Sequence, residues 1–232
     1  MTGRDAPQET LAPALDDDTA AGGHGWRSNM VSAAVAGIGF VAVLPLTALA
    51  GAFVYADVGA PLLFRQTRVG QSAKPIVLTK LRTMSNERGA DGALLPDEAR
   101  LKRIGRWVRR LRVDEIPQLL AIVRGDLAFV GPRPLLPQTV AAFGSLGRHR
   151  CRVRPGLTGW AQVSGNTRLT DDEKLALDIW YVDHRSARLD TQIIFETVRT
   201  ILLGESIRPR RIEDARRYVS ARYGISLKEE ST

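Results

Sequence analysis

The longest apolar stretch of the chain lies near its N-terminus, where no charged residue occurs between Ser28 and Ala56. About 20 apolar residues are enough for a helix to cross a bilayer, so the pattern predicts a membrane-inserted helix over residues 28–60. Pro45 removes one helical hydrogen bond near the middle of this run and favours a bend there. The run can therefore form a kinked spanning helix or a re-entrant hairpin that turns at Leu44–Pro45.

Positive charge flanks this apolar run on both sides. Arg27 precedes it, and Arg65, Arg68 and Lys74 follow it. Because positive residues favour the cytoplasmic side of a membrane, the two flanks favour the re-entrant hairpin. Positive residues are more numerous after the run than before it, so we expect the rest of the chain to lie in the cytoplasm with either topology.

Shorter elements are predicted for the rest of the chain. The segments Leu62–Phe64 and Pro75–Leu78 have the pattern of short strands, with a turn at Gly70 between them. Three glycines predict a loop over 155–165 in which the backbone can approach a ligand closely. Helical patterns cover residues 100–112, 116–124, 172–180 and 191–203. The expected fold class is α+β and mostly helical: a re-entrant membrane hairpin, interfacial amphipathic helices and a small cytoplasmic globular body with short strands.

The helix predicted over 100–112 is strongly basic and amphipathic. Leu101, Ile104 and Val108 fall on one face, while lysine and arginine cover much of the remainder. This pattern is typical of a helix that lies on an anionic membrane surface, and the adjacent apolar run favours that interpretation. An ordinary solvated basic face and a nucleic-acid-binding helix are the alternatives.

Charge and cysteine content narrow the class of protein. The net charge is +8, and the first 24 residues carry −4, which leaves +12 for the remainder. A body this basic is suited to an acidic partner such as phosphate or anionic lipid. The single Cys151 excludes an internal disulfide and a thiol metal cluster, and three histidines do not favour a histidine-rich metal site.

Two adjacent carboxylates, Asp114 and Glu115, stand just before the helix predicted from Ile116. Capping of free N–H groups at a helix start is one explanation for them. The second explanation is phosphoryl chemistry, because Arg109, Arg110 and Arg112 precede the pair and Arg133 follows in a proline-flanked turn. Such cations depress the pKa of a carboxyl group, so that an ionised aspartate can attack phosphorus while a glutamate holds Mg²⁺.

Longer motifs occur in a fixed order along the chain. They are Phe64–Gly70 (FRQTRVG), Lys80–Met84 (KLRTM), Asp114–Leu119 (DEIPQL), Val130–Pro134 (VGPRP) after Gly125–Asp126, Arg154–Val163 (RPGLTGWAQV) and Asp178–Val182 (DIWYV). With these motifs the chain resembles the bacterial sugar transferase family, the small monotopic polyprenyl-phosphate phosphoglycosyl transferases, from about residue 30 to 206.

The resemblance implies an enzyme of the bacterial inner membrane, with its catalytic body on the cytoplasmic face. It implies transfer of a sugar 1-phosphate from a UDP-sugar to undecaprenyl phosphate, with release of UMP, as a first step in building a surface glycan such as an exopolysaccharide. By the same resemblance Asp114 is the nucleophile that forms a covalent phosphosugar intermediate, and Glu115 is the ligand of Mg²⁺. Phosphate or nucleotide contacts are implied for Lys80, Arg82, Arg109, Arg133 and Arg154. Anionic membrane lipid is an expected partner and nucleic acid is not.

Three departures from the family pattern accompany this resemblance. Leu44 stands where the family usually has serine before the hinge proline, the basic motif at the start of the membrane helix is absent, and Asn166 replaces an arginine. The last change affects the expected sugar or nucleotide selectivity. The sequence names neither the sugar nor the glycan pathway nor the oligomeric state. The expected organisation is a flexible acidic tail over 1–27, the membrane segment 28–60, a catalytic domain over 61–206 and a basic, then mixed-charge tail over 207–232.

Overall fold

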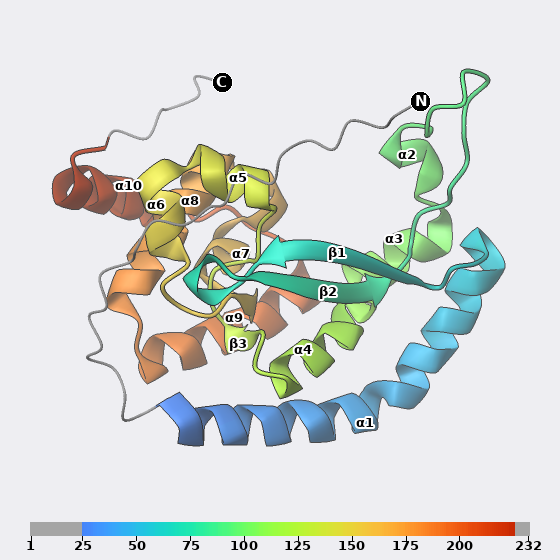
Figure 1. Ribbon diagram of the computed structural model, residues 1–232, viewed down its shortest axis with the longest axis horizontal. Helices are drawn as coiled ribbons and strands as arrows, with labels where there is room; N and C mark the ends of the chain where they lie inside the picture. The colour runs from blue at the N-terminus through green and yellow to red at the C-terminus, as the bar shows by residue number, and fades with distance from the viewer. Residues whose placement is uncertain (1–24, 226–232) are drawn as a thin grey trace, which may run out of the picture.

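The computed structural model describes residues 25–225 (Figure 1), so most of the predicted acidic tail and the last seven residues, 226–232, lie outside the described residues. The described chain is mostly helical with short strands, which confirms the predicted α+β class. The first elements in chain order are α1 (Gly25–Val58), β1 (Leu63–Val69), η1 (Gln71–Ala73), β2 (Pro75–Leu81), α2 (Asp97–Arg100), α3 (Arg103–Arg110), η2 (Val113–Gln118), α4 (Leu119–Val123) and β3 (Ala128–Val130). They are followed by α5 (Pro137–Ala142), α6 (Gly144–Arg150), β4 (Gly156–Thr158), α7 (Trp160–Ser164), η3 (Asn166–Arg168), α8 (Asp171–His184), α9 (Ala187–Leu203) and α10 (Pro209–Tyr223).

Helix α1 is one continuous helix that contains Pro45, and Figure 1 shows it along one side of the body, bent past its middle. Its segment Ser32–Val58 is long and apolar enough to cross a membrane. Both halves contact the body: Ala36 is 1% exposed in a cluster with α4, and Val54 is 1% exposed in a cluster with α3 and η2. Many other apolar side chains of α1 are exposed, as expected of a helix that associates with a membrane.

The two strands predicted after the membrane segment form an antiparallel hairpin. Strands β1 and β2 pair from Leu63↔Leu81 to Val69↔Pro75, so each is longer than its apolar pattern indicated. The register places Lys80 opposite Phe64. The ammonium group of Lys80 lies 5.4 Å from the centre of the Phe64 ring, a cation–π contact that helps to fix the lysine side chain.

The glycine-rich segment 155–165, predicted as a ligand-approaching loop, is instead a strand and a short helix. Strand β4 pairs in parallel with β3, with Val130 opposite Thr158, and α7 follows. Its glycines serve backbone packing: a Cβ on Gly156 would collide with the backbone of Gly131, and a Cβ on Gly131 would collide with the carbonyl of Arg154. The pattern of small residues therefore reports the close approach of two chain segments, which a single sequence does not distinguish from approach to a ligand.

The main hydrophobic core is built by α7, α8, α9 and α10. Helix α8 begins with a capping box in which Thr170 and Glu173 satisfy each other's backbone N–H groups. Helix α10 lies in the segment described from sequence as a charged tail. It packs against α8 through Ile212, Ala215 and Val219, whose spacing of three and four residues gives one buried apolar stripe on an otherwise charged helix.

The remaining predicted helices are present with shifted ends. The basic helix is α3, whose Val108 packs against Val54 of α1, so part of its apolar face meets protein, while Trp107 is exposed. Its contact with lipid stays a prediction. The helix predicted over 116–124 is divided into η2 and α4.

Candidate active site

The carboxylate pair lies on η2, immediately after a reversal of the chain. Arg112 has φ 55° and ψ 22°, in the left-handed region that non-glycine residues rarely adopt. This turn separates α3 from η2 and brings the basic end of α3 beside Asp114 and Glu115. Asp114 is 7% exposed, and the Glu115 side chain is 13% exposed. Strained backbone of this kind often accompanies functional sites.

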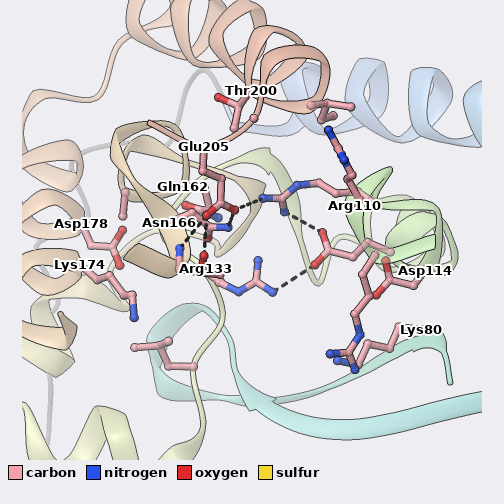
Figure 2. Close-up of a pocket in the computed structure, with 18 of the residues that line it drawn as sticks. Lys80, Arg110, Asp114, Arg133, Gln162, Asn166, Lys174, Asp178, Thr200 and Glu205 are labelled. Atoms are coloured by element: carbon pink, nitrogen blue, oxygen red, sulfur yellow. Dashed lines mark hydrogen bonds and ion pairs between the residues drawn. The ribbon is translucent and has the colours of Figure 1, made fainter. Parts of the chain in front are cut away.

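The pair faces a cavity of about 560 Å³ between η2, α7, α8 and the end of α9. Figure 2 shows Asp114 and Lys80 on one side of the cavity, Asp178 and Lys174 on the other, and Arg133 between them. A cavity of this size is in the range of small-molecule sites. Its charged and amide side chains come from Lys80, Arg109, Arg110, Arg112, Asp114, Glu115, Arg133, Arg150, Gln162, Asn166, Asp171, Lys174, Asp178 and Glu205.

Both carboxylate oxygens of Glu115 are held by arginine. Arg133 Nη2 donates to Oε1 at 3.1 Å, and Arg112 Nη1 donates to Oε2 at 3.3 Å. Burial disfavours ionisation of Glu115, but Arg133 and Arg112 outweigh it and hold the pKa of this carboxyl below its usual range. Glu115 is therefore ionised at neutral pH.

Asp114 has the opposite shift. Burial, together with the neighbouring charge of Glu115, raises the pKa of Asp114 to about 6, against the opposing effects of Lys80 and Arg109. The sequence-based expectation of a depressed pKa is wrong for this residue, because burial outweighs the nearby cations, and Arg112 and Arg133 form their ion pairs with Glu115. At neutral pH most Asp114 is nevertheless ionised, and it has a basicity suited to a nucleophile.

The cations predicted from sequence divide into two groups. Lys80, Arg109 and Arg133 line the cavity with the carboxylate pair, and Arg109 Nε also donates to Thr83 Oγ1 at 2.7 Å. Arg82 and Arg154 do not line it. Arg82 is buried and donates through Nη2 to the carbonyl oxygens of Val58 and Gly59, at 2.8 and 2.6 Å, so it caps the C-terminal end of α1.

Arg150 and Asp178, which both line the cavity, form a buried ion pair. The sequence analysis did not predict this pair. Arg150 Nε donates to Asp178 Oδ2 at 2.8 Å, with both side chains almost fully buried. Arg150 also donates through Nη2 to the carbonyl of Arg133, which fixes the proline-flanked turn. Burial raises the pKa of Asp178, opposed by Arg150. In the sequence, a charged residue within an apolar helical stretch, Asp178, indicates a buried ion pair. Nothing in the sequence indicates that Arg150 is its partner.

The carboxylate pair fits a Mg²⁺ ion whose remaining ligands are phosphate oxygens. Within residues 25–225 no group of three or more His, Cys, Asp or Glu side chains is placed to hold a metal ion by itself. Mg²⁺ is commonly bound by one or two protein carboxylates together with substrate phosphates. Glu115, with Asp114 beside it, provides this kind of incomplete ligand set.

A model of the family described as bacterial sugar transferase matches residues 25–204 of the chain. The chain belongs to the bacterial sugar transferase family. This confirms the resemblance drawn from the motifs and makes the protein a phosphoglycosyl transferase.

Three relatives show how far this sugar transferase resembles known proteins. The uncharacterized sugar transferase EpsL of Bacillus subtilis is 44% identical over 170 residues, which cover 73% of this chain and 84% of EpsL. The undecaprenyl-phosphate glucose phosphotransferase of Komagataeibacter xylinus is 38% identical, over 68% of this chain and 32% of that protein. The UDP-glucose:undecaprenyl-phosphate glucose-1-phosphate transferase of Caulobacter vibrioides is 36% identical, over 68% of this chain and 63% of that protein. The last two are thus longer proteins of which this transferase matches only a part.

Proposed function

We propose that this sugar transferase moves a sugar 1-phosphate from a UDP-sugar to undecaprenyl phosphate and releases UMP, as the first membrane step of a bacterial surface polysaccharide pathway. The names of the Komagataeibacter and Caulobacter relatives support this substrate pair. The observation that carries the proposal is a buried carboxylate, Asp114, in a cavity that is also lined by Lys80, Arg109 and other lysine and arginine side chains. A diphosphate fits these cations, and the carboxylate provides a nucleophile beside it.

The chemistry we propose has two steps. A carboxylate oxygen of Asp114 attacks the β-phosphorus of the UDP-sugar, and the new P–O bond forms as the bond to the UMP oxygen breaks. UMP leaves with that electron pair. A phosphate oxygen of undecaprenyl phosphate then attacks the same phosphorus and releases the Asp114 carboxylate, which leaves a sugar diphosphate on the lipid.

In this proposal, two pairs of cations neutralise the negative charge of the diphosphate. Arg112 and Arg133 have planar guanidinium groups suited to bidentate contact with phosphate oxygens, and both already face the carboxylate pair. The positive charges of Lys80 and Arg109 act on Asp114 and oppose its protonation. Glu115 would hold Mg²⁺, which supplies further neutralisation of charge at the phosphorus when it is bound.

For the membrane segment we propose the re-entrant position, in the inner membrane and with the body on the cytoplasmic face. Ala36 and Val54 both pack against the body. They are about 27 Å apart along a helix that rises 1.5 Å per residue, which nearly equals the hydrocarbon thickness of about 30 Å. A spanning α1 would therefore need the charged body to contact it at both membrane faces, whereas a helix that enters and leaves on one face allows both contacts.

Release of UMP from a panel of UDP-sugars tests the proposed reaction. The purified full chain is mixed with undecaprenyl phosphate, Mg²⁺ and each UDP-sugar. At least one sugar should give UMP, and Asp114→Asn should abolish the release, while the matched control Asp97→Asn, an exposed carboxylate on α2, should not change it. UMP release that survives Asp114→Asn would contradict the mechanism. A protein that binds anionic lipid but releases no UMP from any sugar would be a basic membrane-tethered module instead.

A further inference from the structure

Glu205 lines the cavity and has a fixed position on its wall. It follows Gly204, whose φ of +91° ends α9 and turns the chain toward η3. Its carboxylate accepts hydrogen bonds from Thr167 Oγ1 at 2.6 Å, from the Thr167 backbone N–H at 3.3 Å and from Asn166 Nδ2. Three donors from one short 3-10 helix therefore hold a carboxylate that is still 27% exposed.

This carboxylate faces Arg112. Glu205 Oε1 lies 3.9 Å from Arg112 Nη2, while Nη1 of the same guanidinium pairs with Glu115. Ion pairs thus connect Glu205 to Arg112, Arg112 to Glu115 and Glu115 to Arg133, and dashed lines mark them in Figure 2 between the labelled Glu205 and Arg133. Arg112 thus lies between two carboxylates that come from elements far apart in the sequence.

The two carboxylates, Glu115 and Glu205, differ in their other binding partners. Glu115 is the proposed metal ligand, so its oxygens are shared when a Mg²⁺–diphosphate complex enters. The side-chain partners of Glu205 other than Arg112 are an amide, a hydroxyl and a backbone N–H, which are all neutral. Arg168 donates at 3.4 Å to the backbone carbonyl of Glu205, not to its carboxylate. The negative charge of Glu205 consequently stays directed at Arg112 when Glu115 is engaged elsewhere.

We propose that Glu205 is a positioning residue, which keeps Arg112 in the cavity so that its guanidinium can bind the diphosphate of the UDP-sugar. The inference rests on the proposed function, because it assigns the diphosphate as the ligand of Arg112. An arginine side chain has many rotamers, and a fixed carboxylate reduces the conformational freedom that is lost on binding phosphate. Nothing in the motif pattern of the sequence marks Glu205 for this role.

A double-mutant cycle on UDP binding tests this positioning role. The dissociation constant of UDP, with Mg²⁺ present, is measured by calorimetry on the full chain in detergent. Glu205→Gln keeps a hydrogen-bond acceptor for Thr167 but removes the charge, and should weaken UDP binding about fivefold. In an Arg112→Ala background the same change should alter the constant less than about twofold. The control Glu213→Gln, which removes an exposed carboxylate of α10, should leave UDP binding as in the wild type.

A second variant covers the case in which Glu205→Gln does not fold. Thr167→Val removes the 2.6 Å hydrogen bond but leaves the charges of Glu205 and Arg112 in place. It should weaken UDP binding about twofold, again only when Arg112 is present. Equal weakening in both backgrounds would overturn the inference, since Glu205 would then act on the cavity wall and not through Arg112. Tighter UDP binding by Glu205→Gln would also overturn it, because Glu205 would then only repel phosphate. If the wild type binds no UDP, the proposed function itself fails and this inference fails with it.

Discussion

Arg133 Nη2 lies 3.1 Å from Glu115 Oε1 and so joins the proline-flanked turn to the carboxylate pair. The turn is fixed by Pro132 and Pro134 and by the hydrogen bond from Arg150 to the Arg133 carbonyl. Among the described residues Asp114 has no ion-pair partner within 4 Å, although the charges of Lys80 and Arg109 act on it. Two arginines thus hold Glu115, and we propose that Asp114 is the carboxylate that attacks phosphorus.

The first prediction concerns which carboxylate becomes modified. When UDP-sugar and Mg²⁺ are supplied without lipid, a phosphosugar adduct should form on Asp114, with about one UMP released per enzyme. Glu115→Gln should lower the rate but leave the adduct on residue 114. Mass spectrometry of the stalled enzyme identifies the modified residue. An adduct on Glu115 would reverse the assignment, and strict dependence of UMP release on lipid would favour direct transfer.

The second prediction separates charge from geometry at Arg133. Arg133→Lys keeps the positive charge but loses the planar pair of donors, so kcat/KM for UMP release should fall at least about tenfold. The Arg133 side chain is 45% exposed, so the melting temperature should change little. Thermal melting and steady-state kinetics on the same preparation check both parts. Full activity in the variant would exclude a bidentate phosphate contact.

A third prediction follows from the occupied oxygens of Glu115. Two arginines hold this carboxylate, and Lys80 and Arg109 line the same cavity, so free Mn²⁺, used in place of Mg²⁺, should bind the enzyme weakly. Added UDP gives the arginines another anion and should tighten Mn²⁺ binding at least about tenfold. Electron paramagnetic resonance of free Mn²⁺ measures this directly. Glu115→Gln should remove the UDP-dependent gain, and tight Mn²⁺ binding without UDP would indicate a preformed metal site.

The fourth prediction concerns Arg82, which the motif resemblance placed among the phosphate contacts. Since its guanidinium instead donates to the carbonyls of Val58 and Gly59, Arg82→Ala should cost about 2 kcal/mol of stability. The melting temperature should drop by several degrees, while UMP release per folded enzyme stays within about twofold of the wild type. The control is Arg65→Ala, an exposed arginine of β1. Loss of activity with an unchanged melting temperature would instead support a role for Arg82 in phosphate binding.

The fifth prediction tests the position of α1 in the membrane. Cysteines are introduced at Ser28 and, as a reference on the body, at Glu98, in a Cys151→Ser background. Both should react with a membrane-impermeant thiol reagent from the cytoplasmic side only, because a re-entrant α1 begins and ends on that side. Periplasmic labelling at residue 28 with cytoplasmic labelling at residue 98 would establish a spanning helix.

Local patterns predicted much of the fold. The β1–β2 hairpin follows from two apolar segments around Gly70, and the basic helix α3 follows from its period of apolar residues. The sequence pattern does not predict helix α10, because its buried stripe is narrow and its composition is highly charged. The glycines of 155–165 predict a close backbone approach, but the sequence does not show that the segment Gly156 approaches is the end of β3 and Gly131.

The sequence by itself determined the long apolar segment, the carboxylate pair and the arginines just before it, because each depends on residues close together in the chain. Only the tertiary structure decided which cation meets which carboxylate. Arg133 pairs with Glu115, Arg82 caps α1, and Glu205 lies beside Arg112 although 93 residues separate them in the sequence. Such contacts depend on how the elements pack, and burial in that packing raised the pKa of Asp114 where the local sequence predicted a decrease.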